Sequence, residues 1–94
     1  MTQPSLQQLH AVVYGRVQGV GFRDATQHRA FDLGLTGWVR NQSDGTVETL
    51  AQGDHATLER FLAFLNRGPN AAHVTHVDAL WSAAAQRFDD FHVR

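Results

Sequence analysis

The spacing of hydrophobic and polar positions changes several times along the chain, and each change marks an expected element. Alternating apolar residues and β-branched side chains predict four strands, over residues 9–14, 36–41, 46–52 and 74–81. Apolar or small residues at helical spacing predict one helix from Phe22 to about Leu33 and a second helix after Asp54. Residues 91–94 have the composition of a short terminal strand.

Turn and capping residues between these segments indicate the same boundaries. Gly34 stands where a left-handed residue would close the first helix, and Gly68-Pro69 would stop the second. Asp54 is a suitable N-cap for that second helix, and Ser43-Asp44-Gly45 supplies a turn between two strands. The element boundaries predicted from hydrophobic periodicity therefore agree with those predicted from turn and capping residues.

The resulting order is βαββαβ, with no repeat or low-complexity tract. Its natural solution is the split βαβ arrangement, an α+β sandwich with one antiparallel sheet and both helices on a single face. Right-handed crossovers make the first and second strands parallel, with one strand between them. Their carboxyl ends then lie at the same edge of the sheet, roughly 10 Å apart.

A glycine-punctuated loop, Gly15 to Arg23, leaves the first strand at that edge and leads into the first helix. Its glycines allow φ > 0, so that backbone N–H groups can turn inward, and the positive end of the helix points to the same place. Arg23 adds a planar cationic fork suited to a phosphoryl group. Neither the Lys-Ser/Thr of a Walker loop nor the third glycine of a dinucleotide fingerprint is present. The loop therefore predicts an anion site, and Asn41, at the end of the second strand, should face it.

Composition and net charge indicate the number of domains and argue against binding to nucleic acids or membranes. The chain has 94 residues, 43% of them hydrophobic, which predicts one domain over 1–94 with residues 1–6 as a flexible lead-in. The formal charge is −1 and the basic residues are scattered, so we expect no nucleic-acid partner. No signal peptide, membrane span or cysteine is visible, and we expect a cytoplasmic protein without membrane contact.

The histidines do not predict a metal site. His73 and His76 are three positions apart in an extended segment, which places them on opposite faces of the strand. The sequence shows no third ligand nearby, and a metal site needs three or four. We therefore expect neither a metal nor another cofactor.

Two segments together resemble the signatures of the acylphosphatase family. They read Gly15-x-Val17-Gln18-Gly19-Val20-x-Phe22-Arg23 and Gly37-Trp38-Val39-Arg40-Asn41-x-x-x-Gly45-x-Val47, and weaker matches extend over nearly the whole chain. The resemblance implies a ferredoxin-like βαββαβ sandwich that hydrolyses the carboxyl–phosphate bond of small acyl phosphates without a metal. It places the family's phosphate-binding arginine at Arg23 and its water-positioning asparagine at Asn41.

Elementary chemistry fits these implied roles. A carboxylate is a good leaving group, so phosphoryl transfer from an acyl phosphate depends mostly on positioning and charge stabilisation. The Asn41 amide would place a water in line with the scissile bond. The phosphoryl oxygens would be held by Arg23 and by the backbone N–H groups of Gln18, Gly19, Val20, Gly21 and Phe22. The side chains of Val17 and Gln18 are interpreted as loop structure.

Two other classes stay open at this point. A noncatalytic phosphate-binding or anion-binding regulatory module could share the fold, although the presence of both Arg23 and Asn41 argues against it. A nucleic-acid reader with the same order of elements would carry exposed aromatic residues on its central strands, and residues 46–52 include none. We expect a monomer. No acyl-binding pocket can be read from the sequence, which leaves the acyl group unidentified.

Overall fold

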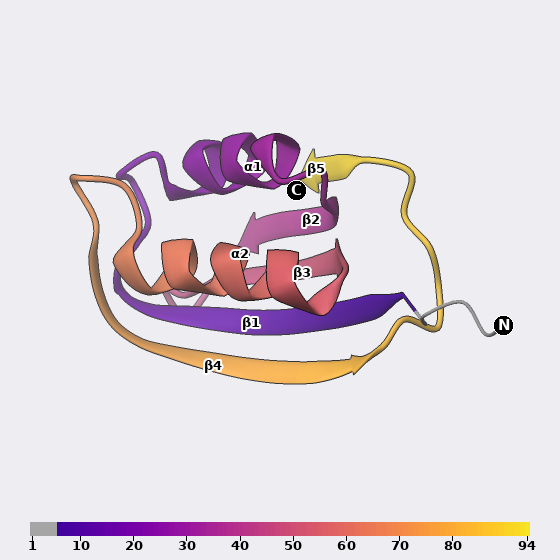
Figure 1. The fold of residues 1–94 in the computed structure, drawn as a ribbon. Helices are drawn as coiled ribbons and strands as arrows, with labels where there is room; N and C mark the ends of the chain where they lie inside the picture. The colour runs from indigo at the N-terminus through magenta and orange to yellow at the C-terminus, as the bar shows by residue number, and fades with distance from the viewer. Residues whose placement is uncertain (1–5) are drawn as a thin grey trace, which may run out of the picture.

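A computed structural model describes residues 6–94 of the chain (Figure 1). Residues 1–5, which make up most of the predicted lead-in, lie outside the described residues. The elements are β1 (Gln7–Arg16), α1 (Phe22–Asp32), β2 (Thr36–Asn41), β3 (Val47–Gly53), α2 (His55–Arg67), β4 (His73–Ala83) and β5 (Phe91–Val93). The predicted βαββαβ order is confirmed, and β1 and β4 extend beyond their predicted bounds at both ends.

The strands form one sheet in the order β4-β1-β3-β2-β5, and both helices cover the same face of it (Figure 1). Neighbours among β1 to β4 pair antiparallel, as predicted. β5 is an addition at the edge, where it runs parallel to β2. Since β3 lies between β1 and β2, these two strands run in the same direction, and the glycine loop and Asn41 emerge at the same edge of the sheet.

The core lies between the helices and the covered face of the sheet. Alternate residues of β1 and β3 point into it, and the fully buried ones are Leu9, Ala11, Val13, Val47, Thr49 and Ala51. α2 contributes Leu58, Phe61 and Leu65, whose i, i+3, i+7 spacing makes one helical stripe. α1 contributes Phe22 and the smaller Thr26 and Ala30. Thr26 donates its hydroxyl to the carbonyl oxygen of Phe22 at 2.7 Å, so that its buried polar group is paired.

The predicted capping residues occupy the ends of the helices. The side chain of Asp54 accepts a hydrogen bond from the backbone N–H of Thr57 at 2.8 Å and so caps α2. Gly68 ends that helix, and its N–H donates to the carbonyl oxygen of Phe64 at 2.7 Å. Gly34 follows α1 with a φ of 69°, the left-handed conformation predicted for it.

The face of the sheet away from the helices carries a cluster of charged side chains around Glu48. This carboxylate lies 2.7 Å from Nε2 of His10 and 2.6 Å from Nε of Arg40. Its side chain is 13% exposed, and burial by itself raises its pKa. Hydrogen bonds from His10 and Arg40 outweigh that effect and hold the pKa of Glu48 below its ordinary value of 4.5.

Phe61→Ala should remove one of the main contacts of the core. The ring is fully buried and packs edge-on against Phe91 of β5, with centroids 6.0 Å apart. We expect a loss of about 3–5 kcal/mol in the free energy of unfolding, measured by urea denaturation. Phe31→Ala is the control, because that ring is 63% exposed, and it should change stability by less than about 0.5 kcal/mol. Equal losses in the two variants would contradict the assignment of the core.

Glu48→Gln should reduce the acid sensitivity of the fold. Because the folded pKa of Glu48 lies below 4.5, its contribution is present above the unfolded pKa and is lost as the pH falls through the folded value. Between about pH 7 and about pH 3 the wild type should therefore lose more unfolding free energy than the variant. Urea titrations at both pH values provide the comparison, and identical losses would rule out this role of Glu48.

Candidate active site

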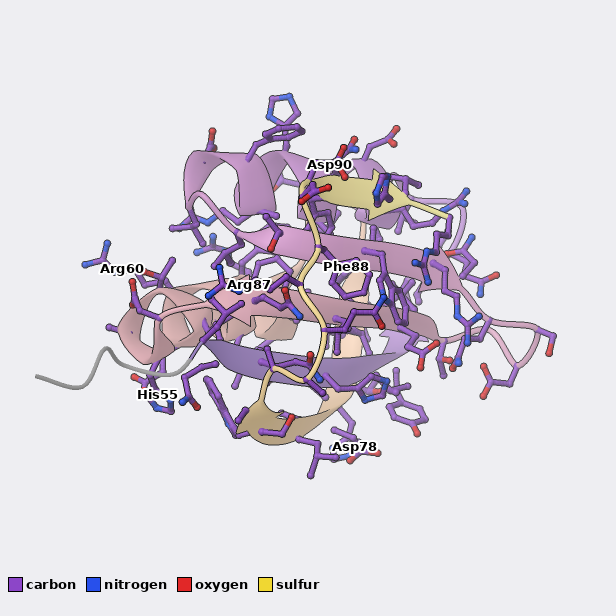
Figure 2. The ribbon with its side chains drawn as sticks, turned by 90° about the vertical axis from the view of Figure 1, so that its right-hand side faces the viewer. His55, Arg60, Asp78, Arg87, Phe88 and Asp90 are labelled. Carbon is purple, nitrogen blue, oxygen red and sulfur yellow. The ribbon has the colours of Figure 1, made fainter. Side chains whose placement is uncertain are left out.

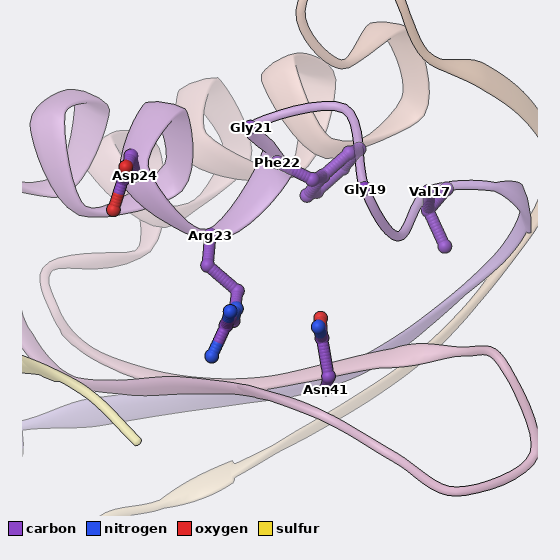
Figure 3. Close-up of a pocket in the computed structure, with 7 residues that line it drawn as sticks. All are labelled: Val17, Gly19, Gly21, Phe22, Arg23, Asp24 and Asn41. Atoms are coloured by element: carbon purple, nitrogen blue, oxygen red, sulfur yellow. The ribbon is translucent and has the colours of Figure 1, made fainter.

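A pocket of about 110 Å³ lies where the glycine loop enters α1, facing the end of β2 (Figure 3). Its lining residues are Val17, Gly19, Gly21, Phe22, Arg23, Asp24 and Asn41. The loop and Asn41 therefore share one pocket, as predicted from the topology. Four of the six residues predicted to bind the phosphoryl group line it, whereas Gln18 and Val20 do not. Val17 and Asp24 line the pocket as well, although the sequence assigned neither of them a binding role.

Two glycines give the loop its shape for different physical reasons. Gly21 has a φ of 76°, and a Cβ added there would meet nothing within 4 Å, so the backbone conformation alone requires glycine. Gly15 lies where the pairing of β1 with β4 shifts register. A Cβ at Gly15 would stand 2.1 Å from the carbonyl oxygen of His73, so close approach of the two strands requires glycine there.

The start of α1 forms one wall of the pocket. Gly21 is its N-cap residue and provides no side-chain hydrogen bond, so no side chain caps the N–H groups of the first turn. Phe22 anchors this end of the helix through its buried ring, whose centroid lies 6.3 Å from that of Phe64. An uncapped helix start of this kind offers N–H donors and a positive partial charge to an anion.

Arg23 and Asn41 extend from opposite walls into the same space (Figure 3). Nη1 of Arg23 donates to the backbone carbonyl oxygen of Arg94 at 3.2 Å. The Asn41 amide has no hydrogen-bond partner among residues 6–94, which leaves its donor and acceptor ends available to a molecule in the pocket. The pocket thus combines a cationic fork, a helix start and an unengaged amide.

Arg94 is a neighbour of the site that the sequence did not indicate. Its N–H donates to the carbonyl oxygen of Val39 at 2.8 Å, and its guanidinium lies over the ring of Trp38, 4.8 Å from the centroid. Both contacts hold Arg94 against β2, where Val39 lies two residues before Asn41. The position of the Arg23 side chain is thereby tied to the same strand that carries Asn41.

Asn41 is followed by a turn with several internal hydrogen bonds. The N–H of Gln42 donates to the carbonyl oxygen of Thr46 at 2.9 Å, and Oγ1 of Thr46 lies 2.7 Å from the side-chain amide of Gln42. Asp44 accepts from the hydroxyl and the N–H of Thr46, and these bonds lower the pKa of its carboxyl. Gln18 reaches across from the glycine loop, and its Nε2 donates to the carbonyl oxygens of Gln42 and Thr46. The turn and the loop are therefore joined.

Two further observations concern the described part of the chain. Within residues 6–94, no three His, Asp or Glu side chains are grouped as a metal site would require. No helix in this range is long and apolar enough to span a membrane.

The chain is similar in sequence and in fold to proteins named acylphosphatase. A family model described as Acylphosphatase matches residues 9–93. The acylphosphatase of Bordetella avium is 42% identical over 97% of each chain, and that of Salinibacter ruber is 50% identical over 89% of this chain and 88% of its own. The crystal structure of acylphosphatase from Bacillus subtilis superposes with a TM-score of 0.91 at 36% identity, covering 94% of this chain and 98% of its own.

Gly15→Ala and Gly21→Ala should differ in their cost to stability. At Gly21 only the left-handed backbone is strained, which predicts a loss of about 1 kcal/mol. At Gly15 the new methyl group would also overlap the carbonyl oxygen of His73, so β4 must move and the loss should be clearly larger. Urea denaturation of both variants tests this, and equal losses would contradict the close approach at Gly15.

Proposed function

The chain belongs to the acylphosphatase family and is an enzyme that hydrolyses acyl phosphates, and we propose how its pocket performs this reaction. Arg23 and the loop hold the phosphoryl group, and Asn41 positions the water that attacks it in line with the scissile bond. The observation that carries the proposal is the placement of Arg23 and Asn41 across one pocket whose wall is the uncapped start of α1.

The phosphoryl oxygens carry the charge that this pocket can stabilise. In the proposal, the N–H groups of Gly19, Gly21 and Phe22 and the guanidinium of Arg23 surround these oxygens. The guanidinium has five N–H donors, so the bond to Arg94 leaves most of them for the substrate. Gln18 and Val20, which do not line the pocket, contribute by shaping the loop. Val20 does so by packing against the core.

The attacking water needs orientation more than it needs a base. The Asn41 amide can accept a hydrogen bond from the water through its oxygen and donate one to the water or the substrate through its nitrogen. The water oxygen bonds to phosphorus as the bond from phosphorus to the acyl oxygen breaks. The carboxylate leaves with the electron pair, and the proton of the water goes to the phosphate product or to solvent. No general acid is required, because a carboxylate is a stable leaving group.

Three parts of the overall picture stay predictions from the sequence. They are the single domain over 1–94, the monomeric state and the cytoplasmic location. The proposal concerns the phosphoryl group alone and does not identify the acyl portion of the substrate.

Arg23→Gln and Asn41→Ala should both abolish most of the activity. The test is hydrolysis of a generic aryl acyl phosphate in the presence of EDTA. Each variant should lose about a hundredfold to a thousandfold in rate, in line with the removal of one stabilising donor from a reaction site. Arg23→Gln should also weaken stabilisation of the fold by inorganic phosphate, whereas Asn41→Ala should retain it.

Two control variants remove the same chemical groups from exposed positions on α2. Arg60→Gln and Asn66→Ala should keep the wild-type rate, since neither residue lines the pocket. A folded wild type that does not exceed the uncatalysed rate would overturn the proposal. Near-normal activity in both Arg23→Gln and Asn41→Ala would overturn the assigned roles.

A further inference from the structure

We propose that the side chain of Gln18 is a positioning residue that sets the separation between the phosphate-binding loop and Asn41. The inference rests on the proposed function, because it concerns the distance between the phosphoryl group on the loop and the water on Asn41. The Gln18 side chain contacts neither the phosphoryl group nor the water. It acts by holding together the backbone of the loop and the backbone of the turn that follows Asn41.

The contacts of Gln18 use both hydrogens of its amide nitrogen. Nε2 donates to the carbonyl oxygen of Gln42 at 2.7 Å and to that of Thr46 at 2.9 Å. Both bonds are partly buried, which protects them from competition with water. The residues joined lie 24 and 28 positions apart in the sequence, so this contact links two separate segments.

The two acceptors are the hairpin residues next to the pair formed by Asn41 and Val47, on the side of the turn. Gln42 directly follows Asn41, and Thr46 directly precedes Val47, the residue that pairs with Asn41 across the strands. The carbonyl oxygen of Thr46 also accepts the N–H of Gln42, so Gln18 joins the first bond of the turn itself. A shift of the Gln18 amide would therefore move the end of β2 that carries Asn41.

These bonds are the link between loop and turn in the described structure. Among the hydrogen bonds of residues 6–94, those of Gln18 alone join residues 17–21 to residues 42–46. The loop has a separate anchor, because Val17 and Phe22 are buried in the core. Without the Gln18 amide the loop should keep its shape and its hold on phosphate, while its distance from Asn41 becomes less well defined.

The expected consequence is a loss in kcat without a matching loss in phosphate affinity. An error of about 1 Å in the placement of a reacting group can lower a rate about a hundredfold. Gln18→Met retains the bulk of the side chain and removes both donors. We expect kcat to fall about tenfold or more, with KM and the inhibition constant of inorganic phosphate within about threefold of the wild type. Gln18→Asn has a shorter side chain whose amide cannot reach both carbonyl oxygens. Its kcat should therefore lie between those of the wild type and Gln18→Met.

Gln52 provides a matched control. It is 2% exposed, and its amide donates to Gln8 at 3.2 Å and to the carbonyl oxygen of Gln86, and accepts from the N–H of Phe88 at 3.1 Å. Gln8 lies at the start of β1, and Gln86 and Phe88 belong to the connection between β4 and β5, at the end of the sheet opposite the pocket, where Figure 2 labels Arg87 and Phe88. Gln52→Met should therefore lower the melting temperature while leaving kcat near the wild-type value, measured well below the melting temperature of each variant.

The outcomes separate the two proposals. A folded wild type without activity would overturn the proposed function and this inference together. An active wild type with unchanged kcat in Gln18→Met would overturn the positioning role alone. So would a loss of activity in which KM and the phosphate inhibition constant rise in parallel, because Gln18 would then serve binding. If Gln18→Met does not fold, the same criteria apply to Gln18→Asn.

Discussion

The pairing of β3 between β1 and β2 is the constraint on which the rest of the site depends. It makes β1 and β2 parallel, so that the loop after β1 and the last residue of β2 meet at one edge. The register matters as much as the order of strands. Asn41 pairs with Val47, and both belong to the face that the helices cover. A slip of one residue would turn Asn41 to the other face, where Arg40 now meets Glu48.

Helix α1 completes the candidate site because Phe22 and Arg23, two consecutive residues at its start, point in different directions. Phe22 enters the core and fixes the position of the helix, and Arg23, about 100° further round the axis, projects into the pocket. Thr26 and Ala30 continue the buried side of α1 with small side chains, which allows the helix to lie close to the sheet. The packing of Phe22 in the core therefore also determines where the Arg23 guanidinium lies.

The parts of this site that could be predicted are those with a local signal. Glycine positions marked the loop, alternation marked the strands, and the handedness of crossovers brought Asn41 opposite the loop. The contact of Arg23 with Arg94 had no such signal, because it depends on the parallel pairing of a three-residue strand, β5, with β2. The loop composition also could not tell which residues line the pocket. The sequence predicted a structural role for the Gln18 side chain, but it could not predict its partners, the carbonyl oxygens of Gln42 and Thr46.

The proposed site has to attract an anion in a protein whose net charge is −1. The attraction has to be local, and the α1 start and Arg23 supply it, while Asp24 in the same lining partly opposes it. Local attraction is useful for catalysis only if the donors do not have to reorganise during the reaction. The core fixes the loop through Phe22, β2 fixes Arg23 through Arg94, and the turn fixes the end of β2. Because these contacts form during folding, the proposed site has its arrangement of donors before a substrate arrives.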